Sequence, residues 1–156
     1  MFESKPLFSV ENYQFSDGIG NLMARVRLSF TKAVDEALQV HNISHTQGII
    51  LMLLHSGQYN TAADLARCLN IDAAGMKRTL DRLEARSLVA RADCALDKRQ
   101  MNLHLLPDGI ELATLIPSIH VAVLNQHFTG FCGAEIDFLK HLLQKMLTNS
   151  ATDIIA

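Results

Sequence analysis

Apolar residues recur along much of the chain at steps of three and four, which is the period of a helix with one buried face. The pattern predicts long helices over about residues 20–40, 107–128 and 134–147. Pro107 suits the first turn of its helix, where an N–H group would have no partner. Pro117 lies inside the same pattern and predicts a kink or a local break there.

Two shorter helices in the middle of the chain are marked by their capping residues. Ser44 is followed three residues later by Gln47, which is a capping-box pattern, and Thr61 is followed in the same way by Asp64. A hydroxyl at the cap accepts a hydrogen bond from a free N–H group of the first turn. The two helices are expected over residues 45–55 and 61–69.

A third short helix is expected over residues 72–85, with Asp72 as its cap. Met76, Leu80 and Leu83 step by four and three, so they share one inward face. The opposite face carries side chains that are mostly small or basic, namely Ala73, Ala74, Lys77, Arg78 and Asp81.

A β-hairpin follows this helix. One strand begins at residues 88–90, and residues 100–105 alternate between polar and apolar as a half-buried strand does. The polar residues 92–99 form its tip. The order of helix, short helix, turn, capped helix, strand, tip and strand predicts a winged helix-turn-helix, in a mainly α fold with a small β-wing and N- and C-terminal dimerisation helices.

The composition is that of a globular protein, which we expect in the cytoplasm. The longest apolar run, residues 49–54, is far shorter than the ~18 residues of a membrane helix, and the N-terminus lacks the pattern of a signal peptide. The cysteines are scattered along the chain, which predicts reduced thiols. The histidines have no cysteine at ligand spacing, so neither a metal nor a cofactor is predicted. The cysteines are Cys68, Cys94 and Cys132.

Charge is distributed unevenly along the chain. The net charge is −2, but residues 61–100 hold eight basic and six acidic residues, a net charge of +2 that leaves −4 for the remainder. A basic middle segment is the electrostatic feature expected where a protein meets nucleic acid.

The predicted helix over residues 72–85 has the side chains needed to enter a major groove. Small residues permit close approach, Lys and Arg bind guanine O6 and N7, and alanine contacts a thymine methyl. The helix start after Thr61 presents N–H groups to a phosphate, and basic residues of the hairpin tip reach phosphates or the minor groove. The candidate contacts with double-stranded DNA are Thr61, Ala73, Ala74, Gly75, Lys77, Arg78, Arg82, Asp97, Lys98 and Arg99.

These motifs resemble the MarR family of bacterial winged helix-turn-helix regulators. The resemblance is carried by residues 65–84 (LARCLNIDAAGMKRTLDRLE), by Leu88 and Val89, and by residues 97–99 (DKR), and it extends over residues 43–109. It implies that Arg99 enters the minor groove, that Asp97 helps to fix it, and that the terminal helices form a dimer.

The chain departs from the family pattern at three positions. Lys98 replaces the first arginine of the usual Asp-Arg-Arg, and Pro107 replaces the usual helix-capping hydroxyl. Ser87 replaces the usual glycine after the recognition helix, so it is expected to adopt the backbone conformation of that glycine at a small cost.

We expect a homodimer that binds a pseudo-palindromic DNA site, because one recognition helix reads few bases. The two-fold symmetry of such a dimer matches two half-sites about 34 Å apart. Residues 1–43 and 107–156 are expected to dimerise, and residues 44–106 to bind DNA. The resemblance also implies a small, aromatic or phenolic effector, for which Arg25 or a histidine would anchor an acid. The candidate lining residues are Phe8, Arg25, Phe30, His45, Met52 and His55.

The sequence thus indicates a ligand-responsive transcriptional repressor without catalysis, since no nucleophile elbow, phosphate loop or zinc-protease motif occurs. Two alternatives remain open. In one, oxidation of Cys68 or Cys132 regulates DNA binding; in the other, the winged helix binds proteins and has lost DNA binding.

Overall fold

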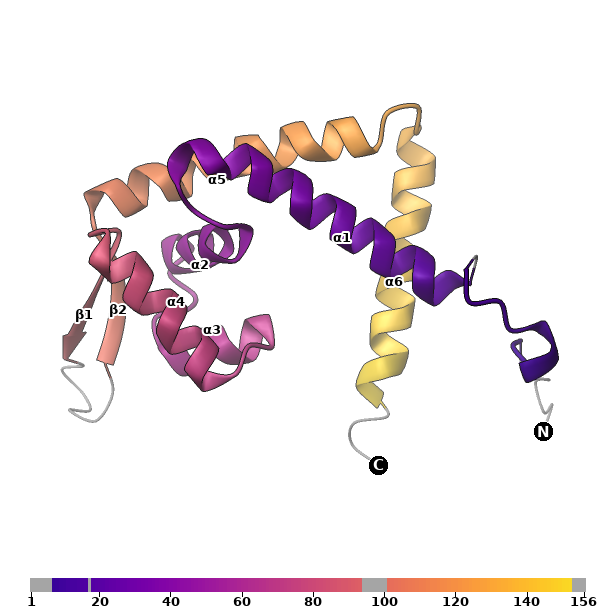
Figure 1. Ribbon diagram of the computed structural model, residues 1–156, viewed down its shortest axis with the longest axis horizontal. Coiled ribbons are helices and arrows are strands. Elements are labelled where there is room, and N and C mark those ends of the chain that lie inside the picture. Colours follow the sequence, from indigo (N-terminus) through magenta and orange to yellow (C-terminus); the bar gives the residue numbers. More distant parts are fainter. Residues whose placement is uncertain (1–6, 17, 94–100, 153–156) are drawn as a thin grey trace. The chain divides into compact units, whose positions relative to one another are not determined.

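The computed structural model describes residues 7–16, 18–93 and 101–152. The described residues form six α-helices and one two-stranded antiparallel sheet (Figure 1). This is the predicted winged-helix architecture, mainly α with a small β-wing. The elements in chain order are the 3-10 helix Val10–Asn12, α1 (Ile19–Leu38), the 3-10 helix Gln39–His41, α2 (His45–His55), α3 (Ala62–Leu69), α4 (Ala73–Ala85), β1 (Val89–Asp93), β2 (Met101–Leu105), α5 (Pro107–His127) and α6 (Gly133–Thr152).

The chain divides into two compact units, Met1–Val123 and Leu124–Ala156. The first unit contains the apolar core, which is built from one face of α1, α2, α3, α4 and α5 together with both strands. Its largest fully buried side chains are Leu38, Ile50, Leu51, Leu65, Met76, Leu80, Leu83, Ile116, Val34 and Val89. The second unit consists of the last turn of α5 and the whole of α6, which extends beyond the predicted end at residue 147.

The three predicted caps are confirmed. Ser44 Oγ accepts from Gln47 N (3.3 Å) while Gln47 Oε1 accepts from Ser44 N (2.9 Å), which is the reciprocal capping box. Thr61 Oγ1 accepts from the backbone N–H of Asp64 at 3.1 Å. Asp72 Oδ1 accepts at 2.7 Å from the N–H of Gly75, which lies in the first turn of α4 and has no carbonyl partner within the helix.

Ser87 has the backbone conformation predicted for it, with φ at +55°. Its N–H donates to Glu84 O (2.9 Å), and the N–H of Leu88 donates to Leu83 O (3.1 Å). These two bonds are the Schellman arrangement, in which a left-handed residue satisfies the last carbonyls of a helix. The turn reverses the chain from α4 into β1 and so sets where the wing begins.

The hairpin is anchored to the helix-turn-helix through its second strand. Val89 pairs with Leu105 and Arg91 with Leu103 in the β1–β2 register. Beyond the hairpin, the N–H of Leu103 donates to Asn60 O at 2.7 Å. Thr61 forms an isolated antiparallel bridge with Asn102. The start of α3 therefore lies directly beside β2.

Helix α5 packs closely against the turn that follows α4. A Cβ on Gly109 would lie 2.0 Å from Leu88 O, so only glycine allows this approach. The helix is continuous through Pro117, which makes the predicted break wrong. Proline removes a single N–H donor, and the burial of Ala113 and Ile116 beside it holds this stretch against the core.

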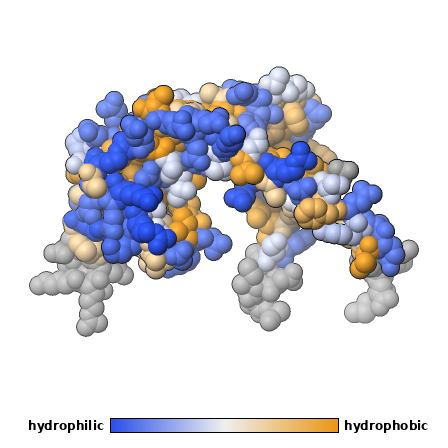
Figure 2. All heavy atoms as spheres, viewed as in Figure 1, coloured by the Kyte–Doolittle hydropathy of each residue, from blue (hydrophilic) through white to orange (hydrophobic). Residues whose placement is uncertain are grey.

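Two segments expose much apolar surface. Figure 2 shows apolar residues among polar ones over the N-terminal segment and α6. In the first unit the exposed apolar residues of the N-terminal segment and α1 are Leu7, Phe8, Val10, Tyr13, Phe15, Ile19, Leu22, Met23, Val26 and Leu28. In the second unit they are Leu124, Phe131, Phe138, Leu142, Leu143, Met146 and Leu147.

By length and composition, α5 is also apolar enough to cross a membrane. Part of this apolar character belongs to Gly109, Ala113, Ile116 and Val123, whose side chains or backbone are buried in the protein. A core helix of a folded domain meets the same criterion.

Candidate nucleic-acid interface

Helix α4 has one face in the core and one face in solvent. Met76, Leu80 and Leu83 are buried, and they are at most 2% exposed. The exposed residues predicted to face DNA are Ala73, Ala74, Lys77, Arg78 and Arg82. Five of the predicted contacts therefore come together on the accessible surface of one helix.

Gly75 also lies close to another residue of the protein. It is half-buried, and a Cβ placed on it would lie 3.1 Å from Ile71 Cγ2, in the turn that precedes α4. A Cβ here would require the Ile71 side chain to move by a few tenths of an ångström, so the small size of Gly75 also eases the packing of this turn. Its contribution to approaching DNA stays a prediction.

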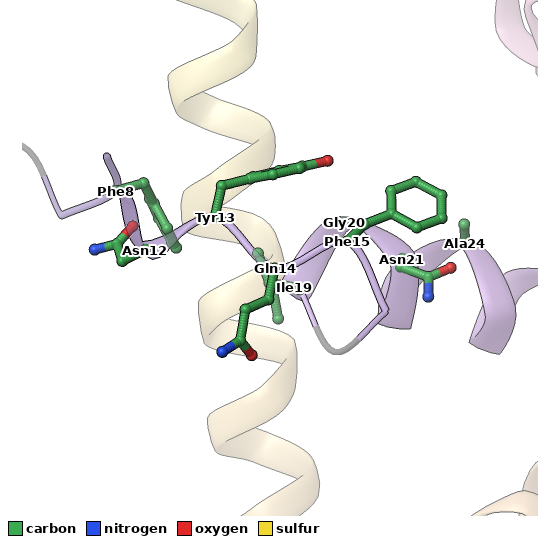
Figure 3. A pocket seen from close by; sticks show the side chains of 10 residues that line it. Phe8, Asn12, Tyr13, Gln14, Phe15, Ile19, Gly20, Asn21 and Ala24 are labelled. Carbon is green, nitrogen blue, oxygen red and sulfur yellow. The ribbon is translucent and has the colours of Figure 1, made fainter. Parts of the chain in front are cut away.

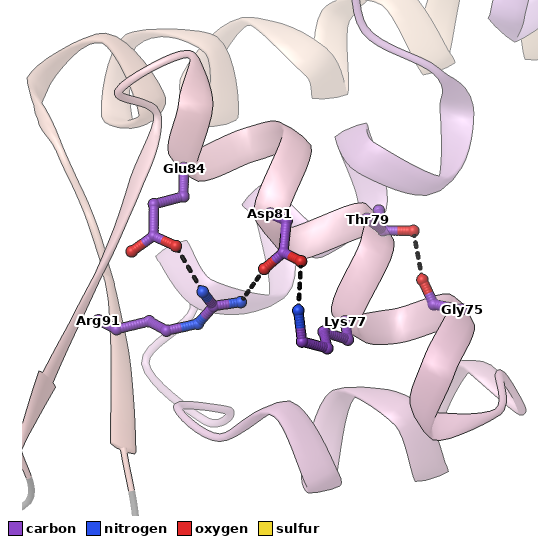
Figure 4. Close-up of polar contacts among 6 residues, drawn as sticks. All are labelled: Gly75, Lys77, Thr79, Asp81, Glu84 and Arg91. Carbon is purple, nitrogen blue, oxygen red and sulfur yellow. Dashed lines mark hydrogen bonds and ion pairs between the residues drawn. The ribbon is translucent and has the colours of Figure 1, made fainter.

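Lys77 belongs to a chain of four charged side chains (Figure 4). Lys77 Nζ lies 2.7 Å from Asp81 Oδ2. Asp81 Oδ1 lies 2.7 Å from Arg91 Nη2, and Arg91 Nη1 lies 2.5 Å from Glu84 Oε2. Hydrogen bonds from Lys77 and then from Arg91 lower the pKa of Asp81 below its ordinary value.

Arg91 connects the wing to the recognition helix in this network. It comes from β1, whereas both of its carboxylate partners come from α4, and its side chain is 26% exposed. The guanidinium matches two carboxylates that lie three residues apart on the helix. This role of Arg91 was not predicted from the sequence, although Asp81 and Glu84 on one helical face, followed by an arginine on the next strand, are a usable signal.

Arg78 and Arg82 are exposed and form no salt bridge with a residue in the described parts of the chain. Arg78 acts only electrostatically on Asp72, whose pKa is lowered chiefly by the N–H of Gly75. Both guanidinium groups can therefore turn toward an external anion without breaking an internal ion pair.

The Thr61 hydroxyl is hydrogen-bonded within the protein. Its hydroxyl accepts from Asp64 N and donates to Asp64 Oδ2 (2.8 Å), and the residue is half-buried. A phosphate at this point would be bound by backbone N–H groups at the start of α3, where Ala62 and Ala63 are exposed. Asp97, Lys98 and Arg99, the predicted contacts of the hairpin tip, lie outside the described residues.

The predicted effector residues do not form one site. Phe30 and His45 meet, with ring centroids 6.0 Å apart, and Met52 is half-buried beside the core. Arg25 and His55 are exposed.

Phe8 lines a separate hollow of about 540 Å³ between the N-terminal segment and the start of α1 (Figure 3). Tyr13 and Phe15 are among its other lining residues. None of the other five predicted effector residues lines it.

Comparison with known proteins agrees with this architecture. Residues 41–100 match the model of the MarR family. The fold matches MepR from Staphylococcus aureus in complex with DNA, with a TM-score of 0.77 and 24% identity over 87% of this chain and 99% of that chain. Residues 41–100 are thus similar to the MarR family, and the described residues share the fold of solved proteins such as MepR.

Two further solved structures share this fold. A cysteine-to-serine mutant of MarR from E. coli, complexed with operator DNA, has a TM-score of 0.77 and 23% identity over 83% of this chain and 93% of that chain. Bordetella bronchiseptica BpsR, whose DNA binding is regulated by 6-hydroxynicotinic acid, has a TM-score of 0.75 and 24% identity over 86% of this chain and 96% of that chain.

MarR-family proteins are DNA-binding transcription regulators and not enzymes. The family match covers α2, α3, α4 and β1, which are the elements that carry the exposed face of α4. The similarity to these transcription regulators therefore lies in the winged helix.

Proposed function

We propose that the protein is a cytoplasmic, homodimeric repressor that places α4 of each subunit in the major groove of a pseudo-palindromic operator. The observation that carries this proposal is the two-sided structure of α4, with three buried apolar residues on one face and Ala73, Ala74, Lys77, Arg78 and Arg82 on the other. Arg78 and Arg82 are the readers best able to reach base edges, because no described residue holds them in a salt bridge.

The exposed apolar surface supports a dimer. Leu142, Leu143 and Met146 on α6 and Ile19, Leu22 and Met23 at the start of α1 are all exposed in a single chain. A monomeric protein rarely leaves so many large apolar side chains in contact with water. Dimerisation would bury them and would also pair two recognition helices, which supplies the specificity that one helix lacks.

Selection of bound sites from random duplexes tests this part of the proposal. The full chain is expected to enrich an inverted repeat with half-sites about one helical turn, ~34 Å, apart. Analytical ultracentrifugation of the complex is expected to show two chains per duplex. A single non-repeated site, or one chain per duplex, would contradict the dimeric mode of binding.

We propose that a small aromatic acid releases the protein from its operator. Support comes from the polar and aromatic groups around Phe30 and His45, and from the regulation of BpsR by an aromatic acid. The test measures operator affinity with a panel of aromatic acids, first 6-hydroxynicotinic acid and salicylic acid. Release by an acid in the wild type and loss of that response in Phe30→Ala, with operator affinity retained, would support the site.

A variant that alters the hollow beside Phe8 is the matched control for Phe30→Ala. Tyr13→Ala alters the hollow and leaves Phe30 and His45 in place. An acid response abolished in Tyr13→Ala and kept in Phe30→Ala would move the proposed effector site to the N-terminal segment.

Thiol oxidation is the second candidate mode of regulation. Cys68 on α3 is exposed, and it acts on the neighbouring Tyr59 hydroxyl, which raises the pKa of that phenol. Peroxide is expected to change operator affinity in the wild type under this alternative. An unchanged peroxide response in a variant with all three cysteines replaced by serine would exclude it.

A further inference from the structure

Three aromatic rings from three different helices meet where α2 joins the rest of the first unit. Phe30 comes from α1, His45 from α2 and His120 from α5. The His45 and His120 rings lie with centroids 5.3 Å apart and planes at 79°, and Phe30 lies 6.0 Å from His45 and 6.3 Å from His120. Edge-to-face contacts of this kind stabilise packing while the rings are neutral.

The polar atoms of this cluster are unequally satisfied. The backbone N–H of His45 donates to Asp35 Oδ1 at 2.6 Å, which ties the start of α2 to α1. His120 Nε2 is buried and has no hydrogen-bond partner among the described residues. A proton added to that nitrogen would be a buried donor without an acceptor, which costs free energy.

The groups that act on the pair electrostatically come from α1 and α2. Asp35 of α1 favours a positive charge on His45, and His45 of α2 disfavours a positive charge on His120 of α5. Burial acts on both rings in the same direction and is the larger effect. It lowers the pKa of His45 against the opposing carboxylate of Asp35, and burial followed by repulsion from His45 lowers the pKa of His120.

We propose that the His45–His120 pair is a proton-sensitive contact that weakens the packing of α2 against α5 in mildly acid solution and thereby lowers the affinity for operator DNA. At neutral pH both rings are uncharged and pack on Phe30. In acid solution one proton places a charge in the cluster, and a second places two like charges at the 5.3 Å separation of the rings. Helix α2 contacts both α1 and β2, so loosening it disturbs the support of the winged helix.

The direction of the pH effect follows from the lowered pKa values. Histidines of the unfolded chain take up protons as the pH falls through their ordinary pKa, 6.5, whereas the folded pair resists until lower pH. The unfolded state therefore binds more protons in this window, and stability decreases as the solution becomes more acid. Above the ordinary pKa the pair carries no such penalty.

The first experiment measures thermal stability of the full chain at pH 7.5 and pH 5.0. His120→Phe keeps an aromatic ring but cannot be protonated, and His120→Gln serves if the larger ring does not fit. The drop in Tm on acidification is expected to be about 3 °C smaller in either variant than in the wild type. His141→Phe, at an exposed position of α6, is the matched control and is expected to show the wild-type drop.

A titration of the histidine ring signals by NMR accompanies this comparison. The signals of His45 and His120 are expected to titrate below 6.5, and the variants His45→Phe and His120→Phe assign them. A parallel Tm profile in the wild type and both His120 variants, or titration of both cluster histidines at or above 6.5, would overturn the proposal.

The second experiment measures affinity for the selected operator duplex at the two pH values. This part rests on the proposed operator binding. Acid is expected to weaken binding several-fold more in the wild type than in His120→Gln or His120→Phe. An equal effect of acid on the operator affinity of the wild type and both His120 variants would refute the proposed regulation of DNA binding. Absence of binding at pH 7.5 would instead refute the proposed operator binding. The Tm comparison would then still test the proton-sensitive contact between His45 and His120.

Discussion

Replacing Ser87 by glycine is expected to stabilise the protein. Ser87 sits at φ +55° in the turn after α4, is exposed, and contributes its backbone N–H to Glu84 O. For a residue with a Cβ, this left-handed region costs roughly 1–2 kcal/mol. Glycine removes that cost but adds chain entropy to the unfolded state, which offsets about 0.4–1 kcal/mol of the gain.

The net gain for Ser87→Gly is therefore about 1 kcal/mol, or a rise in Tm of ~2–4 °C for a chain of this size. Urea unfolding followed by circular dichroism at fixed protein concentration measures it. Ser87→Ala is the matched control, since it removes the same hydroxyl and keeps the Cβ, and it is expected to leave stability unchanged or slightly lower. Equal stability of Ser87→Gly and Ser87→Ala would refute the assignment of strain to this turn.

Three further substitutions test other parts of the structure. Gly109→Ala forces a Cβ to within 2.0 Å of Leu88 O and is expected to lower the Tm by more than about 3 °C, whereas Gly133→Ala, with nothing within 4 Å of its Cβ, should not. Ser44→Ala removes the cap of α2 and is expected to cost about 1 kcal/mol in urea unfolding; no loss would deny the cap its role. Arg91→Met removes the described salt-bridge partner of Glu84 and leaves Asp81 paired with Lys77 alone, which makes α4 more negative. Operator binding measured by fluorescence anisotropy should therefore weaken, and neutralising both carboxylates should restore it; a weakened affinity that neutralisation does not restore would contradict this explanation.

Features set by neighbouring residues could be predicted from the sequence. The caps at Ser44, Thr61 and Asp72 depend on a few consecutive residues, whose hydrogen bonds are the same in any protein. The left-handed conformation of Ser87 was implied by the family resemblance, because serine stands there in place of the usual glycine. The buried face of α4 follows from helical period alone. Pro117 was harder, because whether a proline breaks a helix depends on the packing of its neighbours.

Contacts between distant segments could not be predicted in this way. His120 lies 75 residues from His45 along the chain, and nothing in its local sequence distinguishes it from the other histidines. Arg91 is one basic residue among several in the sequence, and its role becomes visible only where β1 lies beside α4. The arginines that remain available on α4 could likewise be separated from Lys77 only once the partners of each were known.

The salt dependence of operator binding tests the central claim, that the exposed face of α4 binds DNA, most directly. The logarithm of the binding constant is expected to fall linearly with the logarithm of salt concentration. If Arg78 binds a phosphate, Arg78→Ala should weaken binding and reduce the magnitude of the slope by about 0.9 for each phosphate that the arginine neutralises. Lys140→Ala, an exposed cation of α6 paired only with Asp137 among the described residues, should change neither. A wild-type slope near zero, or wild-type affinity and slope in an Arg78→Ala, Arg82→Ala double variant, would contradict the account.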